Sequence, residues 1–341
     1  MRWGEIARAI EPLEDVPLDP EVIAACAGAA GVVNRPIRFS TPTFKAYGGS
    51  EIEGCAKNSF PAFSITAGGC ALDCDHCQAK ILAPMIPATS PETLDRKVRD
   101  LVALQDLRGF LLSGGSSRRN ELPLGRFLPV VARLKHDFPH LRIAVHTALL
   151  DRARAHALDA AGVDTAMMDV IGDAETIRAV YHLDRPVADF EATLAALCET
   201  RMEVVPHIVI GLHYGRLRGE AAALDIVARH PVRALVLVVV MPHYARHGLF
   251  ATPDADAVGR FFATARARLA DRQVLLGCAR PPGRHKRAVD AYAVMAGLDG
   301  IAFPADGAVA LARAIGRPVT QAHACCAVER DGGTVLARAC A

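Results

Sequence analysis

The stretch FSITAGGCALDCDHC, residues 63–77, decides the architecture that we expect for the whole chain. It begins with the short run FSITA, whose apolar and β-branched residues are typical of a buried strand. Three cysteines follow directly, Cys70, Cys74 and Cys77, within eight residues. The stretch therefore predicts a strand that leads straight into a loop bearing three thiols.

The alternation of a β-rich run with a helical stretch occurs eight times from Phe60 almost to the C-terminus. In the stretch SPETLDRKVRDLVAL, Ser90 is placed to cap a helix whose first residue is Pro91. Eight such units over roughly 250 residues predict an α/β fold, a (β/α)8 TIM-type barrel, in which loops after the carboxyl ends of the strands carry the chemistry. A doubly wound open sheet is the alternative, because periodicity does not reveal closure. The expected strands begin at Phe63, Gly109, Leu141, Thr165, Glu203, Ala234, Gln273 and Gly300.

Two helices are expected before the barrel, RWGEIARAI and a second helix capped by Asp19 with Pro20 at its first position. The segment that follows them, residues 35–58, has no clear period, so we expect it to be irregular. The domains predicted in this way are an N-terminal helical extension over residues 1–58, the barrel over 59–316, and a short cysteine-containing tail over 317–341 that closes over the barrel face.

Composition excludes several classes of protein. The 341 residues are 51% hydrophobic, which suffices for a large core, and the formal net charge of +2 indicates neither nucleic-acid nor membrane-surface binding. The N-terminus is acidic where a signal peptide needs an apolar segment, and the longest apolar run, ALVLVVVM, is too short to span a bilayer. We therefore expect a cytoplasmic protein, whose ten cysteines include metal ligands or catalytic thiols rather than structural disulfides.

Three closely spaced thiolates can hold three corners of one metal centre. Soft cysteine ligands suit zinc or an iron–sulfur cluster, but a structural zinc site is normally closed by a fourth ligand. Asp75 and His76 are the nearest candidates for that ligand, and each is adjacent in sequence to a cysteine, which places it poorly for turning inward. The pattern favours a [4Fe–4S] cluster with one open iron over zinc or inert thiols.

The stretch CALDCDHC resembles the CxxxCxxC motif of the radical S-adenosylmethionine (SAM) superfamily. The resemblance implies that Cys70, Cys74 and Cys77 hold the [4Fe–4S] cluster, whose open iron is chelated by the amino and carboxylate groups of SAM. It also implies a ferredoxin or flavodoxin-type electron donor, whose electron cleaves SAM to methionine and a 5′-deoxyadenosyl radical. The barrel would bind and orient the reactants and keep water from the radical.

Other positions match the same superfamily. The run LLSGGSS at the end of the second expected strand matches the glycine pair that approaches the SAM amino group, since glycine permits close backbone approach. The alternative is an ordinary turn between a strand and a helix. By this resemblance, the residues that contact SAM are Ser113, Gly114, Gly115 and Ser116.

Three further positions are candidates for SAM binding. Asp169 ends the fourth expected strand and either binds the ribose hydroxyls or caps the next helix. The run HIVIG resembles the superfamily's GxIxG stretch near the adenine, with Gly211 retained and His207 in place of the first glycine. Met241 and Pro242 offer an apolar wall for the adenine, or belong to the core.

A second set of cysteines predicts an auxiliary cluster. Cys278 ends the seventh expected strand, on the face of a barrel where the loops carry chemistry. We expect a second [4Fe–4S] cluster held by Cys278, Cys55 and one or both of Cys325 and Cys326. The alternative is that these thiols are small buried hydrophobes. Arg280 lies beside Cys278 in the basic run ARPPGRHKR, and His146, His213 and His243 end strands where they either face a substrate or make ordinary hydrogen bonds.

The barrel, the N-terminal helices and the extra cysteines resemble the biotin synthase and lipoyl synthase group. The chain lacks the cysteines of biotin synthase on strands two to six and the dense N-terminal cysteine motif of single-chain lipoyl synthase. It resembles most closely the split lipoyl synthase, in which two related radical SAM proteins add sulfur to an octanoyl or mercaptooctanoyl chain on a lipoyl carrier protein or domain. The alternatives are a biotin synthase-like protein, a radical SAM enzyme that inserts no sulfur, and a non-catalytic iron–sulfur protein.

Overall fold

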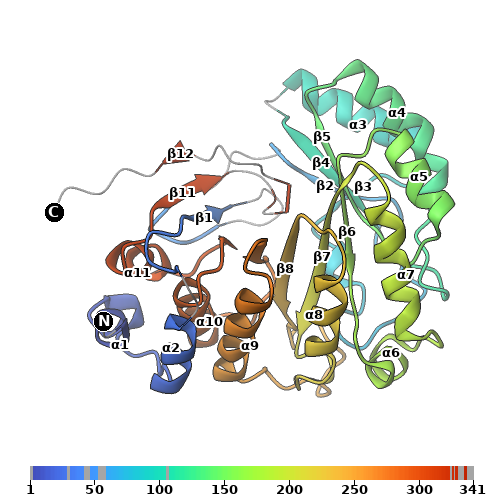
Figure 1. The fold of residues 1–341 in the computed structure, drawn as a ribbon. Coiled ribbons are helices and arrows are strands. Elements are labelled where there is room, and N and C mark those ends of the chain that lie inside the picture. Colours follow the sequence, from blue (N-terminus) through green and yellow to red (C-terminus); the bar gives the residue numbers. More distant parts are fainter. Residues whose placement is uncertain are drawn as a thin grey trace.

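The computed structural model gives the chain a curled parallel sheet whose convex side is covered by helices (Figure 1). This α/β architecture confirms the fold class predicted from the sequence. The residues that the structure describes are 3–28, 31–41, 47–52, 59–104, 107–322, 325, 327–328 and 334–335.

The sheet has 12 strands in the order β12-β11-β1-β10-β9-β8-β7-β6-β5-β4-β2-β3. Neighbouring strands are parallel except β11 and β12, which are antiparallel. In the part of the chain that the structure describes, no ladder joins β3 to β12, so the sheet is an open, curled half-barrel. The strands are β1 (Ile37–Ser40), β2 (Ala62–Ser64), β3 (Ile86–Pro87), β4 (Gly109–Ser113), β5 (Arg142–His146), β6 (Thr165–Asp169), β7 (Glu203–Ile210), β8 (Ala234–Val239), β9 (Gln273–Leu276), β10 (Gly300–Ala302), β11 (Val319–Ala322) and β12 (Thr334–Val335).

All eight expected strands are present, as β2 and β4 to β10. The expectation of an irregular segment over residues 35–58 is wrong in part, because residues 37–40 form β1, which lies between β10 and β11. All four residues of β1 are buried, among them Arg38 and Ser40, whose polarity hides the strand from a reading of hydrophobic period. The sheet thus takes strands from all three predicted domains, and the boundaries between those domains remain predictions.

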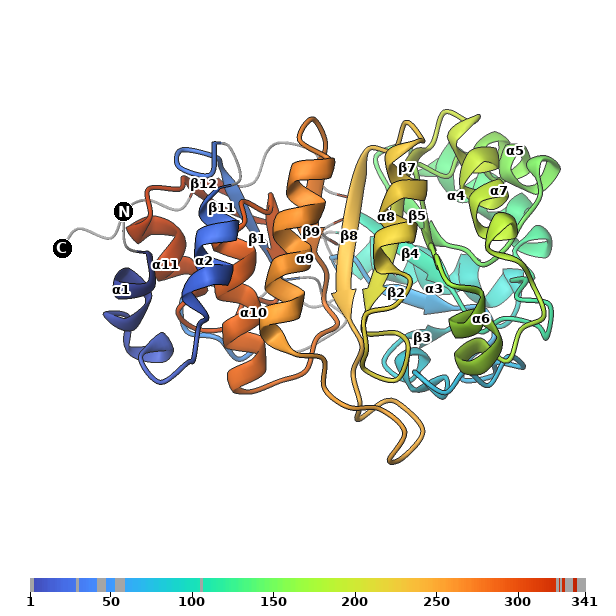
Figure 2. The same cartoon turned by 60° about the horizontal axis from the view of Figure 1, so that its bottom comes forward.

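The helices pack against one side of the sheet, as Figure 2 shows for α8, α9 and α10. Sequence-predicted caps are confirmed: Asp19 accepts from the Glu21 N–H at 2.7 Å, and the Ser90 hydroxyl accepts from the Thr93 N–H at 3.2 Å. The helices are α1 (Trp3–Arg8), α2 (Pro20–Ala27), α3 (Pro91–Leu104), α4 (Leu128–Asp137), α5 (Arg152–Ala160), α6 (Ala174–Tyr181), α7 (Val187–Cys198), α8 (Glu220–Ala228), α9 (Ala255–Arg268), α10 (Arg284–Met295) and α11 (Ala308–Ala314).

A small apolar cluster, distinct from the larger core between helices and sheet, gathers side chains from successive strands and from the tail. Alternation along each strand sends every second side chain to the same face. We call this set the interior cluster; its buried members are Phe60, Ala144, Met167, Val205, Ala234, Val236, Leu275, Ala302, Phe303, Ala327 and Val328. No helix of the described chain is both long enough and apolar enough to cross a membrane.

Candidate functional site

The loop between β2 and β3 carries the three clustered cysteines. Cys74 is buried, and Cys70 and Cys77 are partly buried. Left-handed backbone at Asp73 and Gln78 turns the loop tightly, with φ of 51° and 48°. The Gln78 N–H donates to the Cys74 carbonyl at 3.1 Å, which closes one such turn. Local geometry therefore gathers the thiols at the carboxyl end of β2, where the sequence predicted them.

Cys74 and Cys77 share a thiol hydrogen bond. This bond and the neighbouring His76 lower the pKa of Cys77 to about 4, against burial. The same bond and burial raise the pKa of Cys74 far above its usual range. These contacts favour the thiolate form at Cys77. A thiolate in this state is the form of cysteine that binds metal.

The donor set fits an iron–sulfur cluster better than zinc. Asp75 and His76 are the nearest candidates for a fourth ligand. Asp75 is already engaged, since it accepts three side-chain hydrogen bonds. The His76 ring stacks on Tyr181 with centroids 4.9 Å apart, and its buried Nδ1 has no hydrogen-bond partner among the described residues. No group of three or more His, Cys, Asp or Glu side chains within the described ranges is arranged to hold a single metal ion. Three thiols without a fourth donor match a cubane that leaves one iron open.

The turn after β4 packs directly on the cysteine loop. The Gly115 N–H donates to Thr66 Oγ1 at 2.7 Å, and the Ala71 N–H donates to the Ser116 carbonyl at 2.8 Å. A Cβ atom at Gly115 would lie 2.1 Å from the Gly69 carbonyl oxygen and 2.5 Å from Cys70 Cβ. Glycine is therefore required at 115 because two backbones meet there.

The two preceding residues are more loosely constrained. A Cβ at Gly114 would lie 3.0 Å from Thr66 Oγ1. This contact is tight, but its nearest neighbours are side-chain atoms rather than backbone. The Ser113 hydroxyl is buried and donates to the His146 carbonyl at 3.2 Å. The predicted SAM contacts of residues 113–116 thus lie against the cysteine loop, and their role toward SAM remains a prediction.

Asp169 at the end of β6 does not cap the following helix. The cap of α6 is Asp173, whose carboxylate accepts from the Thr176 N–H at 2.8 Å. Asp169 instead faces His146, with 3.6 Å between Asp169 Oδ1 and His146 Nε2. His207, which pairs with Asp169 in the ladder, packs edge-on against the His146 ring at 5.1 Å between centroids.

The charges of this group are set by burial and by each other. Burial raises the pKa of Asp169, but the hydrogen bond from His146 and the nearby imidazoles outweigh it, so that the pKa falls to about 2. Burial opposes a charge on His146, whose pKa is nevertheless raised by Asp169. Burial lowers the pKa of His207 to about 4. The group therefore presents an ionised carboxylate and a neutral His207 imidazole at neutral pH.

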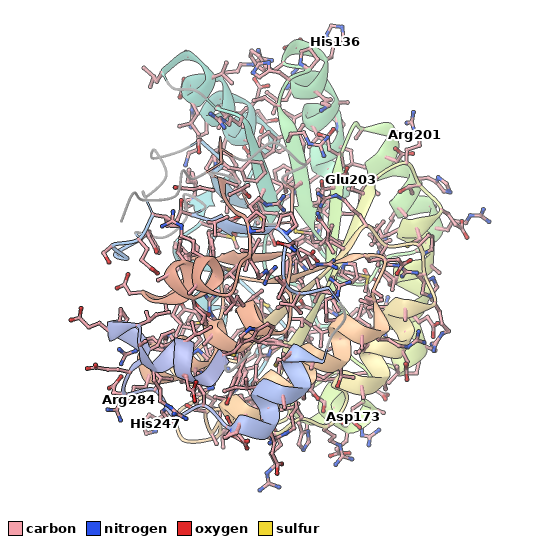
Figure 3. All side chains as sticks on the ribbon, turned by 60° about the vertical axis from the view of Figure 1, so that its left-hand side comes forward. His136, Asp173, Arg201, Glu203, His247 and Arg284 are labelled. Carbon is pink, nitrogen blue, oxygen red and sulfur yellow. The ribbon has the colours of Figure 1, made fainter. Side chains whose placement is uncertain are left out.

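A large cleft opens at the carboxyl ends of β8, β9 and β10. Its volume is about 1700 Å³, and Met241 and Cys278 both line it. Figure 3 shows the carboxyl ends of the strands at the bottom of the view, where Asp173, His247 and Arg284 are labelled. The amino ends lie in the upper part, on the side of His136, Arg201 and Glu203. Further lining residues include Tyr47, Lys80, His243, Tyr244, Arg287 and Phe303.

Comparison with known proteins shows the fold. No family model and no curated protein matches the chain. HydG, a maturase of the [FeFe]-hydrogenase, matches with a TM-score of 0.57 and 13% identity over 83% of this chain and 60% of that one. Methylornithine synthase (PylB) matches with a TM-score of 0.54 and 12% identity over 83% and 75%. HydG from Carboxydothermus hydrogenoformans matches with a TM-score of 0.50 and 15% identity, over 88% of this chain and 70% of that one.

The chain shares the fold of these solved structures. Sequence identities of 12% to 15% establish the fold alone.

Gly211 has a structural reason to be glycine. Its φ of +78° lies in the left-handed region, and a Cβ there would lie 2.4 Å from Pro253 Cγ. Its N–H donates to Glu220 Oε1 at 2.8 Å. These contacts account for the glycine without a ligand, and the predicted contact of Gly211 with adenine stays a prediction.

Two members of the second cysteine set pack against the interior cluster. Cys278, after β9, and Cys325, in the tail, are both partly buried and pack against that cluster. Cys325 is close enough to His146 to act on its pKa. Cys55 and Cys326 lie outside the described residues. The described tail continues inward, where the Ala327 carbonyl accepts from Arg233 Nη1 at 3.1 Å.

Arg280 forms a buried ion pair with Asp290. Its side chain is fully buried, with 0% exposed, and its Nε and Nη2 donate to both carboxylate oxygens of Asp290 at 2.5 and 2.9 Å. It also donates to the Gly277 and Phe303 carbonyls at 2.7 and 2.9 Å. Arg280 therefore ties together the ends of β9 and β10 and fixes the backbone beside Cys278.

The sequence analysis missed the hydrogen bonds of Asp75. Its partners His182, Tyr214 and Arg246 are distant in sequence and follow three different sheet strands. The only local signal was an acidic residue inside the cysteine motif. Of the strand-end histidines, His243 lines the cleft, and His213 Nδ1 is 3.1 Å from Thr176 Oγ1.

Proposed function

We propose that this chain is a radical SAM enzyme that inserts sulfur into a protein-bound acyl chain, as one component of a two-protein lipoyl synthase. The observation that carries the first half is the loop with Cys70, Cys74 and Cys77 at the carboxyl end of β2, in a fold shared with methylornithine synthase. The observation that supports the second half is the approach of Cys278 and Cys325 to one interior cluster.

In this proposal the cysteine loop holds a [4Fe–4S] cluster that, with SAM bound and one electron supplied by a ferredoxin or flavodoxin, generates the 5′-deoxyadenosyl radical. The thiolate character of Cys77 prepares the loop for iron. Gly115 fixes the distance between the cysteine loop and the turn after β4, so that Gly114, Ser113 and Ser116 are positioned beside SAM.

The remaining residues proposed to contact SAM are Asp169, Gly211 and Met241. Asp169 is ionised, and a carboxylate is a strong acceptor for the ribose hydroxyls. Gly211 and Met241 are assigned to the adenine, with Met241 already on the wall of the cleft.

The second cysteine set is assigned to an auxiliary [4Fe–4S] cluster as the source of sulfur. Cys278 lines the cleft, and Cys325 reaches the same interior cluster from the tail. Cys55 and Cys326 are the further ligands that we propose. In this proposal an auxiliary cluster held by these cysteines lies beside the cleft, where its sulfide can reach the substrate.

The cleft supports a substrate larger than a small metabolite. Sites for small molecules usually measure about 300 to 1,000 Å³, and this cleft measures about 1700 Å³. The excess volume admits an acyl chain together with part of the protein that carries it. An octanoylated lipoyl carrier protein or domain is therefore the proposed substrate, and a second radical SAM protein is the proposed partner.

A radical SAM enzyme that inserts no sulfur is the second candidate. The similarity in fold to methylornithine synthase favours it, with a TM-score of 0.54. In that case Cys278 and Cys325 are buried thiols without a metal.

Iron counting separates the two candidates. After anaerobic reconstitution, sulfur insertion predicts about eight irons per chain and the second candidate about four, since each cubane holds four. Cys278→Ala should retain SAM cleavage and lose transfer of sulfur to an octanoyl or mercaptooctanoyl carrier. Cys198→Ala, a partly buried cysteine at the end of α7, is the matched control and should retain both. A Cys278→Ala protein that still thiolates the carrier would contradict the sulfur-donor assignment.

A further inference from the structure

The carboxylate of Asp75, inside the cysteine motif, is bound by three side chains. Asp75 Oδ1 accepts from Arg246 Nε at 2.7 Å and lies 3.0 Å from His182 Nε2. Asp75 Oδ2 accepts from the Tyr214 hydroxyl at 3.2 Å. Both oxygens of one residue of the cysteine loop are thus in use, and all three partners lie outside that loop.

The three partners come from successive segments at the carboxyl edge of the sheet. His182 directly follows α6, Tyr214 follows β7, and Arg246 follows β8. Backbone bonds reinforce the same contacts: the Asp75 N–H donates to the Val180 carbonyl at 2.9 Å, and the Arg246 N–H donates to the Asp75 carbonyl at 2.7 Å. One aspartate therefore joins the cysteine loop to three segments that follow it along the chain.

Burial makes these contacts consequential. The Asp75 side chain is only 6% exposed, and a buried carboxylate is costly unless it is paired and hydrogen-bonded. Asp73, on the same loop, also pairs with Arg246, at 3.0 Å from Nη2, but its side chain is 67% exposed. Exposed ion pairs contribute little. The two aspartates share a loop and a partner and differ in burial.

The segment that Arg246 belongs to also forms a wall of the cleft. Met241, His243 and Tyr244 line the cleft, and Lys80, which follows the last cysteine, donates from Nζ to the Ala245 carbonyl at 3.3 Å. A movement of this segment is therefore transmitted to the cysteine loop through Asp75 and Lys80.

We propose that Asp75 is a positioning residue that fixes the cysteine loop to the segment 241–246, and so sets the place of the iron site relative to the substrate cleft. The contacts stand on the structure alone, while their consequence for SAM rests on the proposed function. Asp75 acts through Cys74 and Cys77, its neighbours in the loop, without touching a substrate.

The first test uses the metal-free full-length chain. Asp75→Asn removes the charge and keeps the size, and loss of charge from buried hydrogen bonds should increase opening of the loop about tenfold or more. The rate of alkylation of Cys74 and Cys77 by iodoacetamide, followed by peptide mass spectrometry, should rise by that factor. Hydrogen–deuterium exchange of the peptide that carries the loop is measured in parallel and should rise by the same factor, which separates access to the loop from a changed thiol pKa.

Two further variants complete this test. Asp73→Asn is the matched control and should alkylate within about twofold of the wild type, as an exposed pair predicts. Arg246→Ala approaches the same contact from the other partner and should behave like Asp75→Asn. An unchanged rate in Asp75→Asn and Arg246→Ala, or an equal increase in Asp73→Asn, would overturn the proposal. Thermal unfolding shows whether each variant folds. If Arg246→Ala does not fold, Arg246→Lys, which keeps the positive charge, is used in its place.

The second test uses the iron-loaded protein. Asp75→Asn should bind the same iron as the wild type, while the change in its electron paramagnetic resonance spectrum on addition of SAM should be reduced or altered. A spectrum and SAM response identical to the wild type would refute a positioning role. If the wild type itself shows no response to SAM, the proposed function fails, and the alkylation result still decides the role of Asp75.

Discussion

Gly115 offers the sharpest perturbation of the candidate site. In Gly115→Ala the new Cβ would lie 2.1 Å from the Gly69 carbonyl oxygen, where an ordinary contact is at least 3.4 Å. The turn after β4 and the cysteine loop must therefore separate by more than 1 Å. Both groups are backbone, which yields less than a flexible side chain, so we expect the upper part of the range for overpacking, about 2–3 kcal/mol of unfolding free energy.

The same displacement acts on Cys70, whose Cβ and Cα would lie 2.5 and 2.6 Å from the added atom. A shift of about 1 Å at a reacting site typically lowers a rate by about 100-fold. Gly115→Ala should therefore lower the rate of 5′-deoxyadenosine formation by about that factor, beyond what its stability explains. The assays are urea unfolding, iron content and SAM cleavage after reconstitution.

Gly68→Ala is the matched control, because Gly68 lies in the same loop and a Cβ there meets no atom within 4 Å. It should match the wild type in stability and activity. A Gly115→Ala protein with wild-type stability and wild-type SAM cleavage would refute the contact between the two backbones as a determinant of the site.

Two other predictions follow from buried charges. Asp290→Ala should destabilise the chain by about 3–5 kcal/mol in urea unfolding, since it leaves the Arg280 guanidinium buried without its carboxylate; a loss below about 1 kcal/mol would contradict this. The lowered pKa of Asp169, about 2, stabilises the fold above the usual pKa of an aspartate, near 3.9, and this contribution disappears as the pH falls through 2. The stability difference between wild type and Asp169→Asn should thus be constant from about pH 5 to 6 and shrink between about pH 4 and 2; a difference that grows on acidification would show the opposite sign of coupling with His146.

The sequence predicted those parts of the molecule that depend on nearby residues. The caps at Asp19 and Ser90 follow from side chains within three residues of the N–H groups they bind. The eight expected strands follow from short apolar or β-branched runs. The three thiols of the cysteine loop were likewise readable, because their spacing is local.

Other parts depend on contacts between distant residues and could not be predicted. Arg38 in β1 is buried between β10 and β11, so its strand is recognised only when both neighbours are in place. Asp75 and Arg246 are 171 residues apart, and nothing in the motif specifies that partner. The alternative that Asp169 caps the next helix was excluded by Asp173, which occupies the cap position four residues later.

The central claim is that this chain cleaves SAM at an iron–sulfur cluster held by Cys70, Cys74 and Cys77. The most direct test is formation of 5′-deoxyadenosine from SAM and a reductant by the anaerobically reconstituted protein, beside Cys77→Ala and the control Cys198→Ala. We predict formation by the wild type and by Cys198→Ala and none by Cys77→Ala. An iron-loaded wild type that forms no 5′-deoxyadenosine, or a Cys77→Ala protein that forms it at the wild-type rate, would contradict the claim.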